Sequence, residues 1–308
     1  DASGWGEIRF WSTLRLADVN GDGKADVCAR SGSAFQCWLS DGSGFPTAVV
    51  GPELSDEKSW GNPQYYATVR MADVNGDGKS DVCARAAAGF RCWLSDGAGF
   101  PTDVVGPELS NDKGWGDPKY WSTIRMADVD GNGKADVCAR SSAGFHCWLS
   151  DGTGFGQQID GPALSDAQSW GEVRYYSTIR LADLSGDGKA DLCARGNVGL
   201  HCWLSTGGGF GEGFELTDLS DAGGWTKPEY FSTIRFGDVD GIGTSDVCAR
   251  AAAGVRCWPF SGSSFGAAVA GPEWSDASGW AGLQYYETFH VAGGWSPKPQ
   301  TCNRKDDD

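Results

Sequence analysis

An acidic, glycine-rich loop contains the residue types and spacing that could bind a metal ion. In "DVNGDGKAD", residues 18–26, oxygen-bearing side chains stand at positions 1, 3, 5 and 9, and Gly23 at position 6 permits a sharp turn. Position 7 adds a backbone carbonyl. Hard oxygen ligands at alternating positions suit Ca²⁺, which takes about six to eight of them. We expect a calcium loop outside the EF-hand class, because its flanks are strand-like and position 12 is Ala29, not Glu.

Five copies of this loop occur at a constant step of 55 residues, beginning at Asp18, Asp73, Asp128, Asp183 and Asp238. Copy four has Ser185 at position 3, and copy five has Ile242 at position 5. We therefore expect three to four calcium ions, the Asp238 loop being the least complete, in a structural role. A metal-free network of Asp, Asn and Gly turns is the alternative. The predicted ligands, with lysine contributing its carbonyl, are Asp18, Asn20, Asp22, Lys24, Asp26; Asp73, Asn75, Asp77, Lys79, Asp81; Asp128, Asp130, Asn132, Lys134, Asp136; and Asp183, Ser185, Asp187, Lys189, Asp191.

Ten of the 11 cysteines form five pairs with one spacing, nine residues. The pairs are Cys28 and Cys37, Cys83 and Cys92, Cys138 and Cys147, Cys193 and Cys202, and Cys248 and Cys257. Zinc sites favour CxxC pairs or histidines, and the chain has only three His. We therefore expect five disulfides and an oxidising, secreted setting. Cys302 is left over and could link chains.

The sequence predicts that short strands position the acidic loops and the cysteine pairs. In one repeat these are "YYSTIRLAD" (175–183), "DLCAR" (191–195) and "GLHCWLS" (199–205), and "TAVVGPELS" (47–55) illustrates the fourth. Four short strands per repeat are typical of a propeller blade, and no helical period is present. The cysteine pairs would then join the second and third strands. The sequence predicts an all-β fold, a β-propeller of 55-residue four-stranded blades.

The first strand occurs six times, from "FWSTLRLA" (10–17) to "YYETFHVA" (285–292). We expect five blades plus an extra copy of the first strand, which could cap the ring, be displaced, or pair with a neighbouring molecule. The predicted organisation is a single propeller over 1–292 followed by a polar tail, 293–308. Its repeats cover about 5–59, 60–114, 115–169, 170–224 and 225–279, with a partial repeat at 280–292.

The loops and the "GxGF" turns that follow them resemble the FG-GAP/VCBS-type repeat of calcium-binding β-propellers. The whole repeat, from "SWGEVRYYSTIRLAD" through the acidic loop to "GLHCWLS", is similar to that of the Psathyrella velutina lectin family over roughly residues 3 to 292. The resemblance implies calcium in some loops, and N-acetylglucosamine or sialic acid sites in clefts between adjacent blades. Five blades instead of seven, and regular cysteine pairs, are departures from that family.

Repeated arginines and aromatics are the candidate sugar contacts, because a sugar needs an aromatic face and charged groups for its hydroxyls. The candidates are Arg30, Trp38, Tyr66, Arg85, Trp93, Trp121, Arg140, Trp148, Tyr176, Arg195 and Trp203. The competing interpretation places the third-strand tryptophans in the core between blades and pairs the second-strand arginines with a carboxylate such as Asp56. The Trp5, Trp60 and Trp115 series could be exposed or line a cleft.

A multivalent lectin is the predicted function, and a structural or adhesion propeller that binds a protein or self-associates is the alternative. The net charge of −16 argues against nucleic-acid binding. No apolar run is long enough to span a bilayer. "GSSFG" (262–266) matches G-x-S-x-G but lies in a turn equivalent to "DGSGF" (41–45), so we expect no enzyme.

Overall fold

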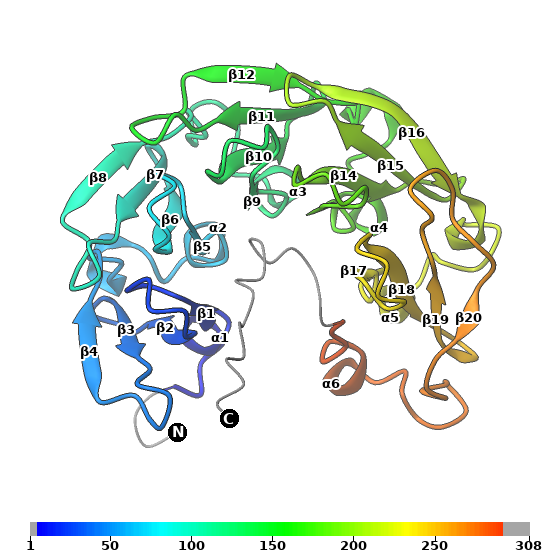
Figure 1. Cartoon of the computed structure of the whole chain (residues 1–308), viewed down its shortest axis with the longest axis horizontal. Coiled ribbons are helices and arrows are strands. Elements are labelled where there is room, and N and C mark those ends of the chain that lie inside the picture. The colour runs from blue at the N-terminus through cyan, green and yellow to red at the C-terminus, as the bar shows by residue number, and fades with distance from the viewer. Residues whose placement is uncertain (1–4, 292–308) are drawn as a thin grey trace, which may run out of the picture. The chain divides into compact units, whose positions relative to one another are not determined.

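A computed structural model describes residues 5–291, which form twenty short strands in five sheets (Figure 1). Each sheet has four antiparallel strands in sequence order, so each is a propeller blade, as predicted. Blades one to three contain β1 (Arg15–Ala17), β2 (Asp26–Arg30), β3 (Phe35–Leu39) and β4 (Thr47–Val50); β5 (Arg70–Ala72), β6 (Asp81–Ala86), β7 (Gly89–Leu94) and β8 (Thr102–Val105); and β9 (Arg125–Ala127), β10 (Asp136–Arg140), β11 (Phe145–Leu149) and β12 (Gln157–Asp160). Blades four and five contain β13 (Arg180–Ala182), β14 (Asp191–Arg195), β15 (Leu200–Ser205) and β16 (Phe210–Leu216); and β17 (Arg235–Gly237), β18 (Asp246–Ala251), β19 (Gly254–Trp258) and β20 (Val269–Ala270).

The chain divides into two compact units. The first comprises the chain up to Leu181 together with Ser205–Gly211, and the second comprises Ala182–Leu204 and the chain from Glu212. Blades one to three belong to the first unit and blade five to the second, while the strands of blade four are divided between them. The boundaries of a single propeller over 1–292 stay a prediction. No helix within 5–291 is long and apolar enough to cross a membrane.

Each blade contains one disulfide inside its central hairpin, as predicted. Strands β2 and β3 place Cys28 directly opposite Cys37, with their Cα atoms 4.0 Å apart. A non-hydrogen-bonded antiparallel pair brings two residues about this close, so a bridge fits the register. The other four disulfides join Cys83 to Cys92, Cys138 to Cys147, Cys193 to Cys202, and Cys248 to Cys257. All five predicted pairs are thus confirmed, and they indicate an oxidising, extracellular environment.

The predicted first strand is wrong over its first half. Tyr175 and Tyr176 end a single helical turn, Val173–Tyr176, and only three residues, such as Arg180–Ala182, pair with the next strand. In blade two, the Asn62 side chain accepts a hydrogen bond from the Gln64 amide, and Pro63 takes the first helical position. A capping side chain followed by proline favours a helix start over an extended strand. The turns are α1 (Ile8–Trp11), α2 (Pro63–Tyr66), α3 (Pro118–Trp121), α4 (Val173–Tyr176), α5 (Pro228–Phe231) and α6 (Leu283–Tyr286), and the 3₁₀ turns are η1 (Asp56–Lys58), η2 (Asp166–Gln168) and η3 (Thr217–Leu219).

The sixth repeat copy retains the helical turn, α6, but residues 287–291 contain no strand. In the five blades the short first strand pairs only with the second strand of the same blade, and no second strand follows the sixth copy within the described residues. The extra first strand is therefore not formed in the described part of this segment. Ala292, the tail 293–308 and Cys302 lie outside the described residues.

The core of the first unit is built between the faces of successive blades. One cluster joins Cys28, Phe35 and Leu54 of the first repeat to Val82 and Ala84 of the second, and all of these residues are nearly inaccessible to solvent. A similar cluster joins the second repeat to the third. Large apolar side chains are thus packed between successive blades. This arrangement fixes the spacing of neighbouring blade faces.

Candidate functional site

The acidic loops are folded around the first aspartate of each copy. Asp18 accepts hydrogen bonds from the amides of Gly21 and Gly23, each at 2.8 Å, and from that of Asp22 at 3.1 Å. Gly21 and Gly23 have φ of 75° and 82°, a left-handed conformation that favours glycine. Asp73, Asp128, Asp183 and Asp238 accept the equivalent bonds. Loop positions 1, 3 and 5 are thereby held on one short turn.

The aspartate at position 9 ties the loop to the blade. Asp136 is fully buried and accepts hydrogen bonds from the amides of Val129 and Ser150, at 2.8 and 2.7 Å. Burial, with the charges of Asp130 and Asp128, raises the pKa of Asp136 to about 7. Burial likewise raises the pKa of Asp128. Crowded carboxylates whose charged forms are disfavoured fit a site that a divalent cation would neutralise.

The five loops differ in the charge around the candidate metal position. In the third, Asp128, Asp130 and Asp136 each offer a carboxylate oxygen within 4.8 Å of the others. The fifth loop brings Asp238, Asp240 and Asp246 equally close, although it was the least complete by sequence. In loops one, two and four the lysine at position 7 forms an ion pair with the carboxylate at position 5. Loop three has no such pair, because its position 5 is Asn132. These pairs are Lys24–Asp22, Lys79–Asp77 and Lys189–Asp187.

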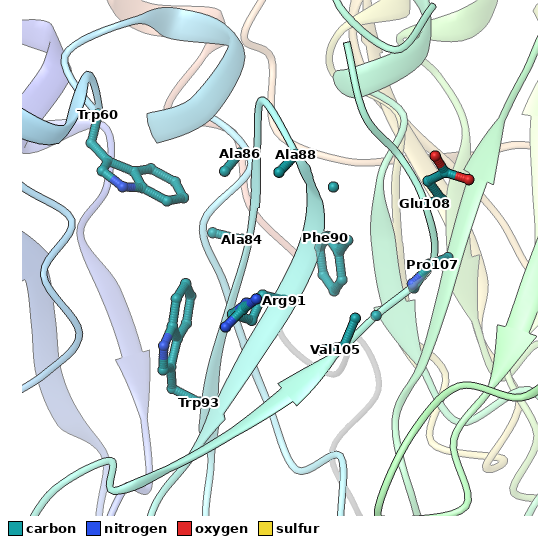
Figure 2. A pocket seen from close by; sticks show the side chains of 12 residues that line it. Trp60, Ala84, Ala86, Ala88, Phe90, Arg91, Trp93, Val105, Pro107 and Glu108 are labelled. Atoms are coloured by element: carbon teal, nitrogen blue, oxygen red, sulfur yellow. The ribbon is translucent and has the colours of Figure 1, made fainter. Parts of the chain in front are cut away.

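A pocket of about 200 Å³ lies on the face of blade two that packs toward the first repeat (Figure 2). Trp60, from the connection before α2, and Trp93 of β7 contribute aromatic rings, and Arg91 lies beside Trp93. Val105 and Glu108 line the opposite side in this view. The pocket thus combines aromatic faces with a cation and a carboxylate at its edge, a composition that suits a small polar ligand.

Trp93 lines this pocket, and its polar neighbour Arg91 was not among the residues predicted from the sequence. Arg91 precedes Trp93 by two residues on the same strand face, is paired with Asp103 and keeps about half of its side chain exposed. This position is polar in every blade and differs between blades: Gln36, Arg91, His146, His201 and Arg256. The residue at this position is always polar but differs from blade to blade, whereas the tryptophan two residues later is constant. This pattern could have identified Arg91 from the sequence.

The other third-strand tryptophans are half-buried or buried. In blades one, three and five they contact the tryptophan that precedes the blade, with ring centroids about 6 Å apart: Trp5–Trp38 at 6.1 Å, Trp115–Trp148 at 6.3 Å and Trp225–Trp258 at 6.2 Å. Trp60 and Trp93 have no such contact, and the pocket opens between them. In blade four, His201 stacks on Trp203 with centroids 5.8 Å apart.

The second-strand arginines are structural, which corrects the prediction that they contact a ligand. Arg140 is fully buried, and its Nε donates to the Leu164 carbonyl at 2.6 Å while its Nη2 donates to Asp166. The equivalent partners lie 24 and 26 residues after the arginine in each repeat. The buried side chains are Arg30, Arg85, Arg140, Arg195 and Arg250. Each guanidinium fastens the second strand to the connection after the fourth, so it cannot reach a ligand in a cleft.

Three overlapping matches to the FG-GAP-like repeat cover residues 18–84, 73–139 and 128–194, which together exceed half of the chain. The chain belongs to the FG-GAP-like repeat family. Each match begins at the first aspartate of an acidic loop and ends on the second strand of the next repeat. The resemblance predicted for these loops is thereby confirmed at the level of the repeat.

Solved structures similar to this FG-GAP-like chain include a lectin from Agrocybe aegerita that specifically recognises non-reducing terminal N-acetylglucosamine. It is 22% identical with a TM-score of 0.76, over 86% of this chain and 67% of the lectin. The Photorhabdus luminescens Tc holotoxin pore is 18% identical with a TM-score of 0.53, over 85% of this chain and 12% of the toxin chain. At these identities the likeness concerns the fold alone. No curated protein sequence matches the chain.

The aromatics that precede the first strands of the FG-GAP-like blades lie on helical turns and not on strands. Tyr66 on α2 is buried, with 7% of its side chain exposed. Trp121 on α3 and Tyr176 on α4 are half-buried. None of the three lines the pocket of blade two. The pocket therefore does not support the prediction that these three residues contact a sugar, which stays a prediction.

Blade three contains a hydrogen-bonded chain of serine, histidine and aspartate. His146 Nδ1 lies 2.8 Å from Asp160, and its Nε2 lies 3.1 Å from the Ser141 hydroxyl. The Ser141 oxygen also accepts from the Ala143 amide at 3.1 Å, which closes the hairpin turn. Ser31 closes the same turn in blade one, where the histidine position is Gln36. The serine therefore has a turn-forming role that does not depend on the histidine.

The network around Asp166 predicts an acid-sensitive contribution to stability. Burial alone would raise its pKa, but hydrogen bonds from Tyr120, Arg140 and Lys119 lower the pKa of Asp166 to about 2. A carboxylate whose pKa is lower in the folded state than in the unfolded state stabilises the folded state. This contribution is complete above the unfolded pKa of about 3.9 and is lost as the pH falls toward 2. The free energy of unfolding of the wild type should therefore fall toward that of Asp166→Asn between these pH values. Urea unfolding at stepped pH measures the difference, and a constant gap would contradict the network.

Proposed function

We propose that the chain is a multivalent carbohydrate-binding protein whose glycan sites lie in clefts between adjacent blades. The observation that carries the proposal is the pocket of blade two, where Trp60, Trp93, Arg91 and Glu108 surround a space of about 200 Å³. An aromatic face accepts the C–H side of a sugar ring, and charged side chains bind its hydroxyl or carboxylate groups. Equivalent aromatic and polar positions recur in the other blades, and weak sites formed there would act together with this one on a glycan-coated surface.

N-acetylglucosamine is the first ligand to test, because a lectin of the same fold recognises it at non-reducing ends. Sialic acid is the second, since Arg91 and Arg256 could each pair with its carboxylate. We further propose that Ca²⁺ ions bind the acidic loops and act structurally, and that the chain is secreted. We propose no catalytic role, because the serine of the Ser141–His146–Asp160 chain closes a turn and Asp160 is about three-quarters exposed.

The test is a glycan array followed by calorimetry with the monosaccharide that binds. We expect Trp93→Ala and Arg91→Ala each to remove one site from the measured stoichiometry, because losing an aromatic or arginine anchor typically weakens binding by about 2 kcal/mol or more. Trp11→Ala is the matched control, since Trp11 is 53% exposed and lies outside the pocket. Both pocket variants should be compared with wild type for retained fold by circular dichroism.

Two outcomes would overturn this proposal. One is no binding to any glycan on the array. The other is an unchanged stoichiometry in both pocket variants. Absence of glycan binding together with self-association in light scattering would instead favour a structural or adhesion protein. Binding that chelation abolishes only slowly, as the fold loosens, would agree with structural calcium.

A further inference from the structure

Four first strands of the first compact unit begin with an arginine that no sugar or calcium role explains. They are β1, β5, β9 and β13, and β5 lies beside both β1 and β9. All four side chains are partly exposed. We name them the first-strand arginine cluster: Arg15, Arg70, Arg125 and Arg180.

Backbone carbonyls, not carboxylates, hold these guanidinium groups. Arg15 donates from Nε and Nη2 to the Val69 carbonyl, at 3.2 and 2.9 Å. Its Nη1 donates to the carbonyls of Ser12 and Leu14, at 3.0 and 2.8 Å. Arginine has five N–H donors, so four are used and one N–H of Nη2 has no acceptor within residues 5–291.

The same arrangement recurs one repeat later. Arg70 donates from Nε and Nη2 to the Ile124 carbonyl, at 3.3 and 3.0 Å, and from Nη1 to two carbonyls of its own repeat. Arg125 donates from Nε to the Ile179 carbonyl at 3.1 Å. Arg15, Arg70 and Arg125 are thus each fixed by the next repeat in a set orientation. Preorganised guanidinium groups with a remaining N–H are suited to an oxyanion.

The charges of the cluster act on one another. Burial, together with the positive charges of Arg15 and Arg180, lowers the pKa of Arg70 to about 9. Burial and the charges of Arg180 and Arg70 lower the pKa of Arg125. Guanidinium groups stay cationic at neutral pH, because arginine is not deprotonated in proteins. Within the described residues Arg15, Arg70 and Arg125 form no ion pair, although sequestered charges are normally paired.

The second compact unit provides an internal comparison. Its first-strand arginine, Arg235, is also partly buried, and burial lowers its pKa. There the negative charge of Glu287 acts in the opposite direction and favours the cation. The equivalent position can therefore be balanced by a carboxylate. Among the described residues of the first unit, no carboxylate is found to act in this way on Arg70 or Arg125.

We propose that the first-strand arginine cluster binds an oxyanion, either an inorganic ion of the sulfate or phosphate type or a carboxylate. Arg15, Arg70 and Arg125 would contribute hydrogen bonds, and Arg180 would contribute its charge. The bound ion would neutralise a local excess of positive charge in a protein whose net charge is −16. This site is separate from the proposed glycan pocket, and its test does not depend on sugar binding.

The experiment is a calorimetric titration of the full chain with sulfate and, separately, with acetate, at neutral pH and a constant ionic strength set by chloride. Sulfate is preferred over phosphate because phosphate would sequester calcium from the acidic loops. We expect saturable binding of at least one of the two ions. Arg70→Met should weaken binding about tenfold or more, since a hydrogen bond to a charged group contributes about 1.5–3 kcal/mol and 1.4 kcal/mol is tenfold. Lys58→Met, an exposed lysine outside the cluster, should leave it unchanged.

Wild-type titration decides the proposal even where a variant fails to fold. Sulfate binding alone would identify an inorganic oxyanion site, and acetate binding alone a carboxylate site. No saturable binding of either ion would overturn the proposal. Equal affinity in the wild type, Arg70→Met and Arg125→Met would overturn it as well, since the ion would then bind elsewhere.

Discussion

Asp166→Ala is expected to lower the free energy of unfolding by about 3–5 kcal/mol, because it leaves a buried charge without its partner. Arg140 is fully inaccessible, and Asp166 is the carboxylate that its Nη2 contacts. Asp166 also accepts from Tyr120 at 2.7 Å and Lys119 at 3.0 Å. The substitution therefore removes three hydrogen bonds from one carboxylate. Urea unfolding of the full chain at neutral pH would measure the loss.

Two variants sharpen this test. Asp166→Asn should cost much less, because blade two already pairs Arg85 with Asn111 at the equivalent position. Asp103→Ala should cost less than about 1 kcal/mol, since its partner Arg91 is on the surface and exposed ion pairs contribute little. If Asp166→Ala destabilised the chain no more than Asp103→Ala, the claim that the ion pair between Arg140 and Asp166 stabilises the fold would be wrong.

Removal of calcium by a chelator is expected to lower the unfolding temperature strongly. An ion that binds only the folded chain at a thousand times its dissociation constant stabilises it by about 4 kcal/mol, and three to four loops are candidates. We expect the third loop to bind most tightly, because Asp128, Asp130 and Asp136 converge there and no lysine covers the position-5 side chain. Differential scanning calorimetry with calcium and with excess EGTA provides the measurement.

The third loop can be tested individually. Asp130→Ala should remove one calcium ion from the stoichiometry found by calorimetric titration, and Asp112→Ala, an exposed aspartate outside the loops, should remove none. An unfolding temperature that is insensitive to EGTA, with no calcium uptake, would leave the loops as metal-free turns. Uptake by the fifth loop would show that three converging carboxylates outweigh Ile242 at position 5.

The repeat, the blades and the disulfides could be predicted because each depends on local sequence. A constant 55-residue step, glycines at positions requiring positive φ, and cysteines nine residues apart all act within one hairpin. The helical turns were missed although "NPQYY" contains both a capping residue and a proline at the first helical position. Tyrosine, serine and threonine favour strands or turns, and this preference concealed the cap.

The role of the second-strand arginine was harder to predict because a fully buried arginine is rare. Its partners are far away along the chain, yet they lie at the same distance in every repeat, as in Arg30 with Asp56 and Arg250 with Asp276. Pairing with Asp56 was the competing interpretation of the sequence, and the constant spacing of 26 residues favours it. The pocket itself could not be predicted, since its volume depends on whether Trp60 packs against Trp93, a property of tertiary contacts.

The disulfides also bear on how the chain could be made. Every cysteine in the five pairs finds its partner nine residues away, inside one hairpin, and none of these five disulfides joins two blades. If the chain is secreted as proposed, each repeat could oxidise before the next repeat is synthesised, as segments of a growing chain fold in order. Correct pairing would require no distant partner, so incorrect cross-links between repeats would be disfavoured by timing as well as by geometry.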